Sequence, residues 1–106
     1  MNEGKELVAA ISFLARMTVK PGREEEFLRL ARTLEEKVDA NEPDTLYYRF
    51  FRLREDRQYA VMESFADEAA EELHMNSDYL AETAPSLLDC LEGDPPYVRE
   101  YLDPIE

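Results

Sequence analysis

This sequence of 106 residues has few residues of four types: one cysteine, one histidine, three glycines and no tryptophan. The single cysteine, Cys90, cannot form a disulfide within the chain, so a reducing cytoplasm is the expected compartment. One histidine and one cysteine cannot build a zinc site without several added carboxylates. Three glycines leave no glycine-rich loop for phosphate. We therefore expect no metal and no cofactor.

Basic residues and long apolar runs are also lacking. The chain has 12 lysines and arginines against 25 aspartates and glutamates, which gives a net charge of −13. Such a surface repels phosphate backbones and anionic lipid headgroups, so neither nucleic acid nor membrane is an expected partner. No apolar run approaches the roughly 18 residues that a membrane span needs, and the first six residues do not resemble a signal peptide.

The sequence that remains has the composition of a globular protein, with 44% apolar and 35% charged residues. Its length predicts a single domain, 1–106, with a core over about 7–102. Apolar and turn residues predict elements in the following order: a strand over 7–19, a helix over 24–40, strands over 45–53 and 58–65, a helix from 68 that breaks at 76–78, a helical stretch over 79–91 that Pro85 splits, and a strand over 97–102.

This order, β-α-β-β-α-β, is that of the ferredoxin-like α+β fold, in which two helices cover one face of a four-stranded antiparallel sheet. The first two strands are apolar on both faces; in the second, Leu46, Tyr48 and Phe50 oppose Tyr47, Phe51 and Leu53. A second copy of the chain is the simplest cover for the other face, which predicts a homodimer stacked sheet on sheet. An RNA-binding platform is the alternative, and the acidic charge disfavours it.

His74 and Glu63 are the candidate catalytic residues. Histidine is the side chain whose unperturbed pKa lies near neutrality, so His74 can act as a general base or bind substrate, or can simply be tied to a carboxylate. Glu63 lies in the middle of a strand, on the same face as Tyr59 and Phe65, and a buried carboxylate there needs a partner. It either acts directly or anchors His74 or the dimer.

Tyr48, Arg49, Asn41 and Phe65 are the candidate substrate-binding residues. Tyr48 and Arg49 are consecutive in a strand and point to opposite faces, so one faces the helices and the other faces the partner chain. Core packing is the alternative role of Tyr48, and a helix C-cap is that of Asn41.

Four segments resemble the antibiotic biosynthesis monooxygenase family, and the similarity extends over roughly residues 8 to 102. These segments are Val19–Phe27, Asn41–Tyr48, Met62–His74 and Ser77–Tyr79. The resemblance implies a dimeric α+β barrel and a cofactor-independent monooxygenase that acts on a small aromatic substrate, a quinol or polyphenol. The alternative is a non-catalytic dimeric barrel that binds a small ligand. The haem-degrading branch of the family has a tryptophan and a later histidine where this chain has His74 and Ala84, so haem degradation is not expected.

Overall fold

The computed structural model describes residues 10–105, and the predicted order of elements is confirmed there. The elements are β1 (Ile11–Thr18), α2 (Glu24–Asn41), β2 (Thr45–Arg52), β3 (Gln58–Phe65), α3 (Glu68–Met75), α4 (Asp78–Asp89) and β4 (Arg99–Leu102). The predicted start of the first strand, 7–9, lies outside the described residues. None of the helices in the described part is both long and apolar enough to cross a membrane.

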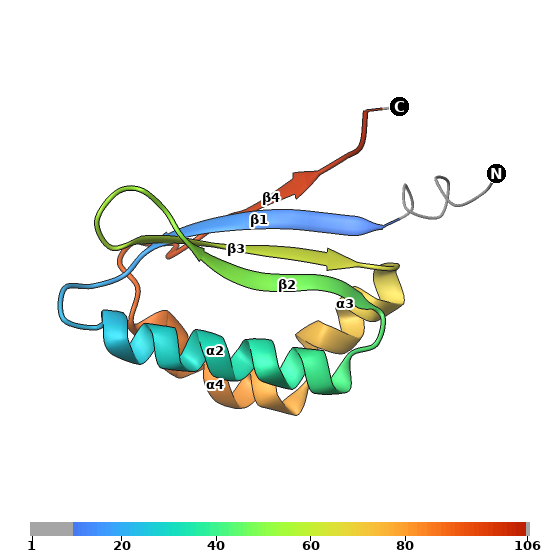
Figure 1. Cartoon of the computed structure of the whole chain (residues 1–106), viewed down its shortest axis with the longest axis horizontal. Helices are drawn as coiled ribbons and strands as arrows, with labels where there is room; N and C mark the ends of the chain where they lie inside the picture. The colour runs from blue at the N-terminus through green and yellow to red at the C-terminus, as the bar shows by residue number, and fades with distance from the viewer. Residues whose placement is uncertain (1–9, 106) are drawn as a thin grey trace.

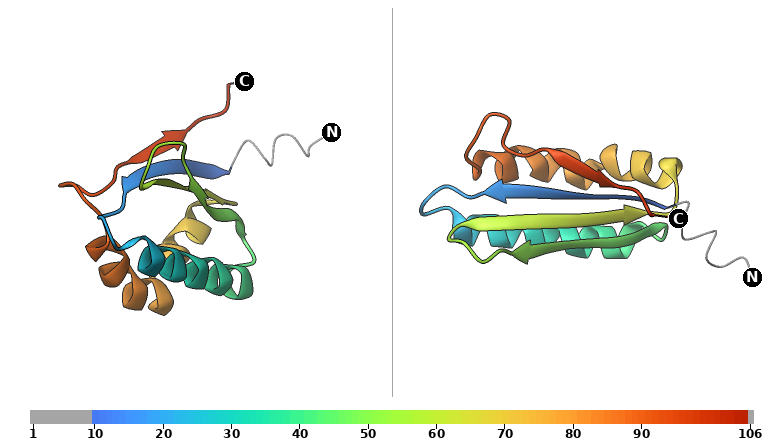
Figure 2. Two further views of the ribbon diagram at one scale, coloured as in Figure 1. Left: turned by 60° about the vertical axis from the view of Figure 1, so that its left-hand side comes forward. Right: turned by 90° about the horizontal axis from the view of Figure 1, so that it is seen from above.

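The four strands form one sheet in the order β2-β3-β1-β4, and every neighbouring pair is antiparallel. All three helices lie under the same face of this sheet (Figure 1). When the sheet is viewed from above, α2 runs along one side of it and α3 and α4 run along the other (Figure 2). This is the predicted ferredoxin-like α+β fold. Its opposite face is not covered by any of residues 10–105.

Local sequence explains where the helices begin and end. Glu24, Glu25 and Glu26 occupy the first turn of α2, where the helix dipole favours negative charge. The Asp67 side chain caps α3 by accepting a hydrogen bond from the Ala70 N–H. Ser77 caps α4 in the same way, so the predicted break at 76–78 is confirmed.

The predicted split at Pro85 is wrong, because α4 continues through this residue. Proline removes one helical hydrogen bond and leaves the carbonyl group four residues earlier without its donor. Both Pro85 and Ala81 are exposed, so water can bind that carbonyl group without distorting the helix.

The core lies between the helices and the covered face of the sheet. Phe27 of α2 is fully buried in it, with its ring centroid 4.9 Å from that of Tyr59 and 5.8 Å from that of Phe50. Other fully or nearly buried side chains around it come from α2, β1, β3 and the turn after α4; they include Leu34, Val38, Met17, Val19, Val61 and Leu91.

The other face of the sheet is less apolar than the sequence predicts. In β1 the outward positions are Ser12, Leu14 and Arg16; the Ser12 hydroxyl contacts that of Ser64 at 2.8 Å, and Arg16 pairs with Glu100. In β2 an irregularity between Thr45 and Tyr47 shifts the register, so Leu46 is 52% exposed instead of facing the helices with Tyr48 and Phe50. The apolar residues that remain form a patch, the open-face patch: Leu14, Tyr47, Phe51, Leu53, Ala60 and Met62.

Replacement of the α3 cap, Asp67→Ala, is expected to lower the free energy of unfolding by about 1 kcal/mol, because the Ala70 N–H loses its acceptor. Urea denaturation of the variant and the wild type measures this difference. Asp103→Ala, at an exposed position after β4, is the matched control and should have no measurable effect. Equal losses in the two variants would contradict the capping role.

Candidate functional site

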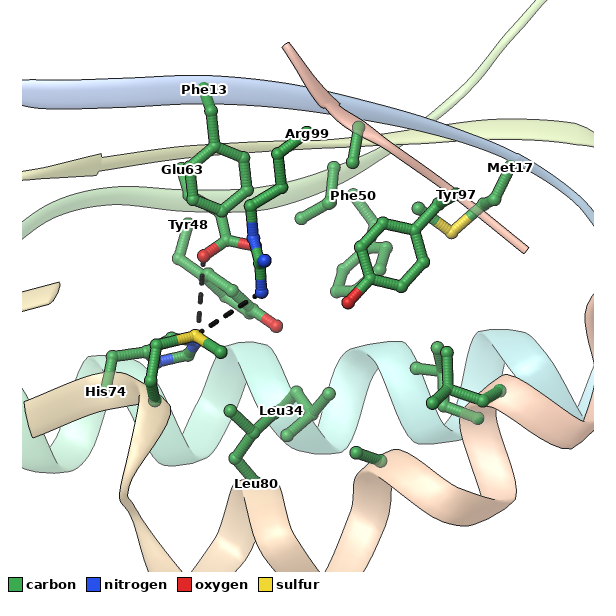
Figure 3. Close-up of a pocket in the computed structure, with 16 residues that line it drawn as sticks. Phe13, Met17, Leu34, Tyr48, Phe50, Glu63, His74, Leu80, Tyr97 and Arg99 are labelled. Atoms are coloured by element: carbon green, nitrogen blue, oxygen red, sulfur yellow. Dashed lines mark hydrogen bonds and ion pairs between the residues drawn. The ribbon is translucent and has the colours of Figure 1, made fainter. Parts of the chain in front are cut away.

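A cavity of about 140 Å³ lies between the sheet and the helices (Figure 3). Its walls are mainly apolar side chains from both layers, among them Phe13, Met17, Leu34, Phe50, Leu80 and Leu87. Its polar groups come from β2, β3, α3, β4 and the segment that leads into β4; they are Tyr48, Glu63, His74, Arg99 and Tyr97. Such a small set of polar groups in an apolar cavity is typical of a small-molecule site.

His74 lies in the last turn of α3 and is almost completely buried. Its ring packs between Tyr48 and Phe65, at centroid distances of 5.1 and 5.5 Å. Its Nδ1 lies 3.0 Å from the nearer carboxylate oxygen of Glu42. A carboxylate only accepts hydrogen bonds, so the proton of the neutral ring resides on Nδ1 and Nε2 is left free on the cavity side.

Glu42, the residue directly after α2, fixes the orientation of the His74 ring. Its buried carboxylate accepts hydrogen bonds from the hydroxyl of Thr45 at 2.6 Å and from the hydroxyl of Tyr79, in addition to the bond from His74. Three donors compensate a buried carboxylate for the loss of water. Glu42 is therefore a stable anchor for the imidazole ring.

Glu63 has no comparable set of partners. It is 7% exposed, and its Oε1 is buried without a hydrogen-bond partner among residues 10–105. His74 Nε2 lies 3.6 Å from this oxygen, which is too long for a hydrogen bond. Burial raises the pKa of Glu63 to about 8, the nearby Arg99 opposes this rise, and the negative charges of Glu42 and Glu71 add to it. At neutral pH Glu63 is thus mainly a protonated carboxyl group that faces the cavity.

Tyr48 and Arg99 complete the polar wall. Burial, together with the charges of Glu63 and Glu42, raises the pKa of Tyr48 well above its ordinary value, so its hydroxyl group keeps its proton. The Arg99 guanidinium lies over the rings of Phe13 and Tyr97, at 5.3 and 5.8 Å from their centroids. Figure 3 shows the Tyr48 hydroxyl, the Glu63 carboxyl group and the Arg99 guanidinium directed into one space above His74.

Three of the six predicted site residues, His74, Glu63 and Tyr48, line this cavity, and the other three do not. The Asn41 amide group donates to the Lys37 carbonyl at 2.8 Å and so serves the C-terminus of α2. Arg49 pairs with Asp39 of the same chain at 3.1 Å. Phe65 is fully buried and packs against the His74 ring.

Sequence reasoning missed Glu42 and Arg99. Glu42 precedes Pro43, and this position indicates only the turn that ends a helix. Arg99 lies in a short, mostly exposed edge strand. Only tertiary contacts give these residues their places: the end of α2 meets α3, so that Glu42 contacts His74, and the pairing of β4 with β1 brings Arg99 to the cavity. Within residues 10–105, no group of three histidine, cysteine, aspartate or glutamate side chains is arranged to hold a metal ion.

The sheet order and the single layer of helices define the chain as a ferredoxin-like α+β protein with a cavity beneath its sheet. Comparison with known families then identifies it more closely. The model of the antibiotic biosynthesis monooxygenase family matches residues 10–85, and the chain belongs to this family.

Solved structures of similar proteins agree with this assignment. A proposed antibiotic biosynthesis monooxygenase from Caulobacter crescentus is 31% identical, with a TM-score of 0.85, and the match covers 99% of this chain and 98% of that one. A conserved protein from Methanosarcina mazei is 25% identical, with a TM-score of 0.84 and coverage of 94% and 97%. A Pseudomonas aeruginosa protein at 22% identity, with a TM-score of 0.79 and coverage of 94% and 98%, shares the fold. The comparison with curated proteins gives no match.

The raised pKa of Glu63 predicts how stability changes with pH. Between its ordinary pKa of 4.5 and about 8, the unfolded chain has lost a proton that the native chain keeps. The free energy of unfolding therefore falls as pH rises through this window and levels off above it. Glu63→Gln has no such proton, so its stability relative to wild type should rise between pH 5 and pH 8.5, by on the order of 3 kcal/mol.

Urea denaturation of both proteins at the two pH values measures this change. Glu55→Gln, an exposed position in the β2–β3 hairpin, is the control and should follow wild type at both pH values. If the stability of Glu63→Gln relative to wild type were the same at pH 5 and pH 8.5, Glu63 would have an ordinary pKa in the native protein.

Proposed function

We propose that the protein is a cofactor-independent monooxygenase that oxidises a small phenol or quinol in the cavity beneath its sheet. The observation that carries the proposal is the pair of polar atoms at this cavity, Nε2 of His74 and Oε1 of Glu63, which lie 3.6 Å apart. Oε1 has no hydrogen-bond partner among residues 10–105. Membership of a monooxygenase family supports the reaction class. The substrate class rests on the apolar and aromatic walls of the cavity.

In the proposed reaction, His74 Nε2 takes the phenolic proton, while Glu42 on Nδ1 stabilises the imidazolium ion that forms. The electron-rich phenolate then gives electrons to O₂. For a phenol with a free ring C–H, the balanced reaction is phenol plus O₂ to quinone plus water. One oxygen atom becomes the new carbonyl group, and the other leaves as water with two hydrogens of the substrate. The substrate is thus its own reductant, and no further reductant enters the balance.

The walls of the cavity serve this chemistry by limiting water. A phenolate that is shielded from water is a better electron donor than a hydrated one, and its intermediates are protected from hydrolysis. The rings of Phe13, Tyr48 and Phe50 and the side chain of Leu80 surround the position that such a substrate would occupy (Figure 3).

The test of this proposal is O₂ uptake with a panel of single-ring quinols, corrected for oxidation without protein. His74→Gln keeps an N–H donor for Glu42 but removes the base, so kcat is expected to fall by about 100-fold or more. Glu42→Gln, which leaves the base in place but weakens its anchor, should lower kcat less and shift the pH profile of kcat. Undiminished kcat in His74→Gln would contradict the assigned role. Binding of quinols without turnover in the wild type would favour the alternative, a ligand-binding barrel.

We also propose that the active form is a homodimer joined through the open-face patch. Tyr47 and Phe51 are 43% and 44% exposed, and their rings stack at 6.4 Å. An exposed aromatic patch of this kind on a sheet is typical of an interface, and the dimeric barrels of the family resemblance have such an interface. The cytoplasmic location and the single domain over 1–106 remain predictions from the sequence.

Phe51→Glu is expected to dissociate the dimer, because it places a charge at the centre of an apolar interface. Light scattering should give the wild type a mass of twice the 12.4 kDa of the chain, and the variant a mass of one chain. Leu73→Glu is the matched control: Leu73 is 57% exposed but lies on α3, on the helix side of the sheet. A wild-type mass of one chain at micromolar concentration would contradict the proposed dimer.

A further inference from the structure

Arg99 is placed so that its side chain reaches the cavity from the edge of the sheet. In the ladder between β1 and β4 it lies opposite Ala15, whose side chain points toward the helices. Directly opposed residues share a face of the sheet, so Arg99 points to the helix side as well. Because Ala15 is small, the guanidinium can extend over the neighbouring Phe13 ring and into the cavity, as Figure 3 shows.

In the part of the chain that the structure describes, the Arg99 guanidinium differs from the other half-buried arginines in having no acidic partner. Among residues 10–105, the other half-buried arginines, Arg23, Arg49 and Arg57, each pair with a carboxylate within 4.0 Å, whereas Arg99 pairs with none. A guanidinium has five N–H donors. The acceptor found for Arg99 is the thioether sulfur of Met75 at 3.6 Å, and sulfur is a weak acceptor.

Two further polar groups face the same space without a mutual hydrogen bond. The buried Oε1 of Glu63 has no hydrogen-bond partner among the described residues. The Tyr48 hydroxyl is directed toward the same space (Figure 3). Because its pKa is about 8, the Glu63 carboxyl group carries a proton at neutral pH and can donate it in a hydrogen bond. The three groups together offer N–H and O–H donors to one oxygen atom of a ligand.

The volume of the cavity limits what such a ligand can be. An apolar protein cavity of about 150 Å³ accepts one benzene molecule, and the cavity here measures about 140 Å³. A ligand with a single aromatic ring therefore fits. The net charge of −13 repels anions at long range, so any selection of an anion in this site must come from the local donors.

We propose that Arg99 makes this cavity selective for single-ring aromatic ligands that carry an anionic oxygen, as a phenolate or a carboxylate. The Arg99 guanidinium binds the anionic oxygen, Glu63 and Tyr48 donate to it, and the apolar walls hold the ring. This inference rests on the proposed function for the place where the substrate binds, and it narrows the substrate class. It is independent of whether the bound ligand is oxidised.

Direct binding measurements test it without any turnover. Isothermal titration calorimetry at pH 7 compares benzoate with benzamide, which have the same shape and differ in charge. It also compares pentafluorophenolate, which is ionised at this pH, with pentafluoroanisole, so that a phenolate is distinguished from a carboxylate. We expect wild type to bind at least one of the two anions at least about tenfold more tightly than its neutral counterpart. The anion with the larger gain in affinity over its neutral counterpart shows whether the site selects a carboxylate or a phenolate.

Arg99→Met is the diagnostic variant, because methionine keeps an unbranched apolar stem and loses the charge. It should abolish the preference for the anion while leaving the affinity for the neutral ligands unchanged, and Arg99→Lys should restore part of the preference. Arg32→Met is the matched control: Arg32 is an exposed residue of α2 that does not line the cavity, and its replacement should leave the affinities for both kinds of ligand unchanged.

Each outcome bears on the proposal. Equal affinity for an anion and its neutral counterpart in wild type, for both pairs, would overturn it. A preference that persists in Arg99→Met would also overturn it, because the selection of the anion would then come from other groups. The proposal would be supported if the preference for the anion disappears in Arg99→Met but not in the control variant, and if Arg99→Met unfolds at the same temperature as wild type. Support for anion binding combined with no O₂ uptake would count against the monooxygenase function and not against this inference.

Discussion

The carboxylate of Glu42 holds together the parts of the molecule on which the site depends. It stands at the end of α2 and accepts hydrogen bonds from Thr45 at the start of β2, from His74 of α3 and from Tyr79 of α4. A buried carboxylate without donors would be strongly destabilising, so the three elements must stay close enough to supply them. The position of His74 beneath the sheet therefore follows from a polar constraint as much as from apolar packing.

The buried acids Glu42 and Glu63 differ in the hydrogen-bond donors around them. Glu42 has a full set of donors and serves as a structural anchor, whereas Glu63, on the other side of the same imidazole ring, has a buried oxygen without a partner. Their environments differ because Glu42 lies where helix ends and a turn bring polar groups together, and Glu63 lies in the middle of a strand among apolar side chains. A histidine between two carboxyl groups of such different environments is suited to proton transfer. Arg99 is the one lysine or arginine in the cavity wall among residues 10–105.

The order of the elements was predictable from the sequence because each carries a strong local signal. The stripe of apolar residues in α2, the caps Asp67 and Ser77, and the alternation in β3 depend on residues a few positions apart. The same reasoning put Glu63 on one face with Tyr59 and Phe65. It also selected His74 and Tyr48 as candidates, but it left open which face of the sheet Tyr48 occupies. It failed for Leu46, because a β-bulge reverses the direction of a side chain without any sign in the composition of the strand.

Local sequence patterns predicted the ferredoxin-like order, and the composition established the acidic charge and the single histidine. The partners of that histidine depend on tertiary contacts between distant elements. Glu42 and His74 are 32 residues apart, and Arg99 reaches the cavity only because β4 pairs with β1. The tertiary structure also withdrew Asn41, Arg49 and Phe65 from the cavity. The physical reason is the same in each case: periodicity specifies the face of an element on which a side chain lies, whereas packing between distant elements specifies what that face meets.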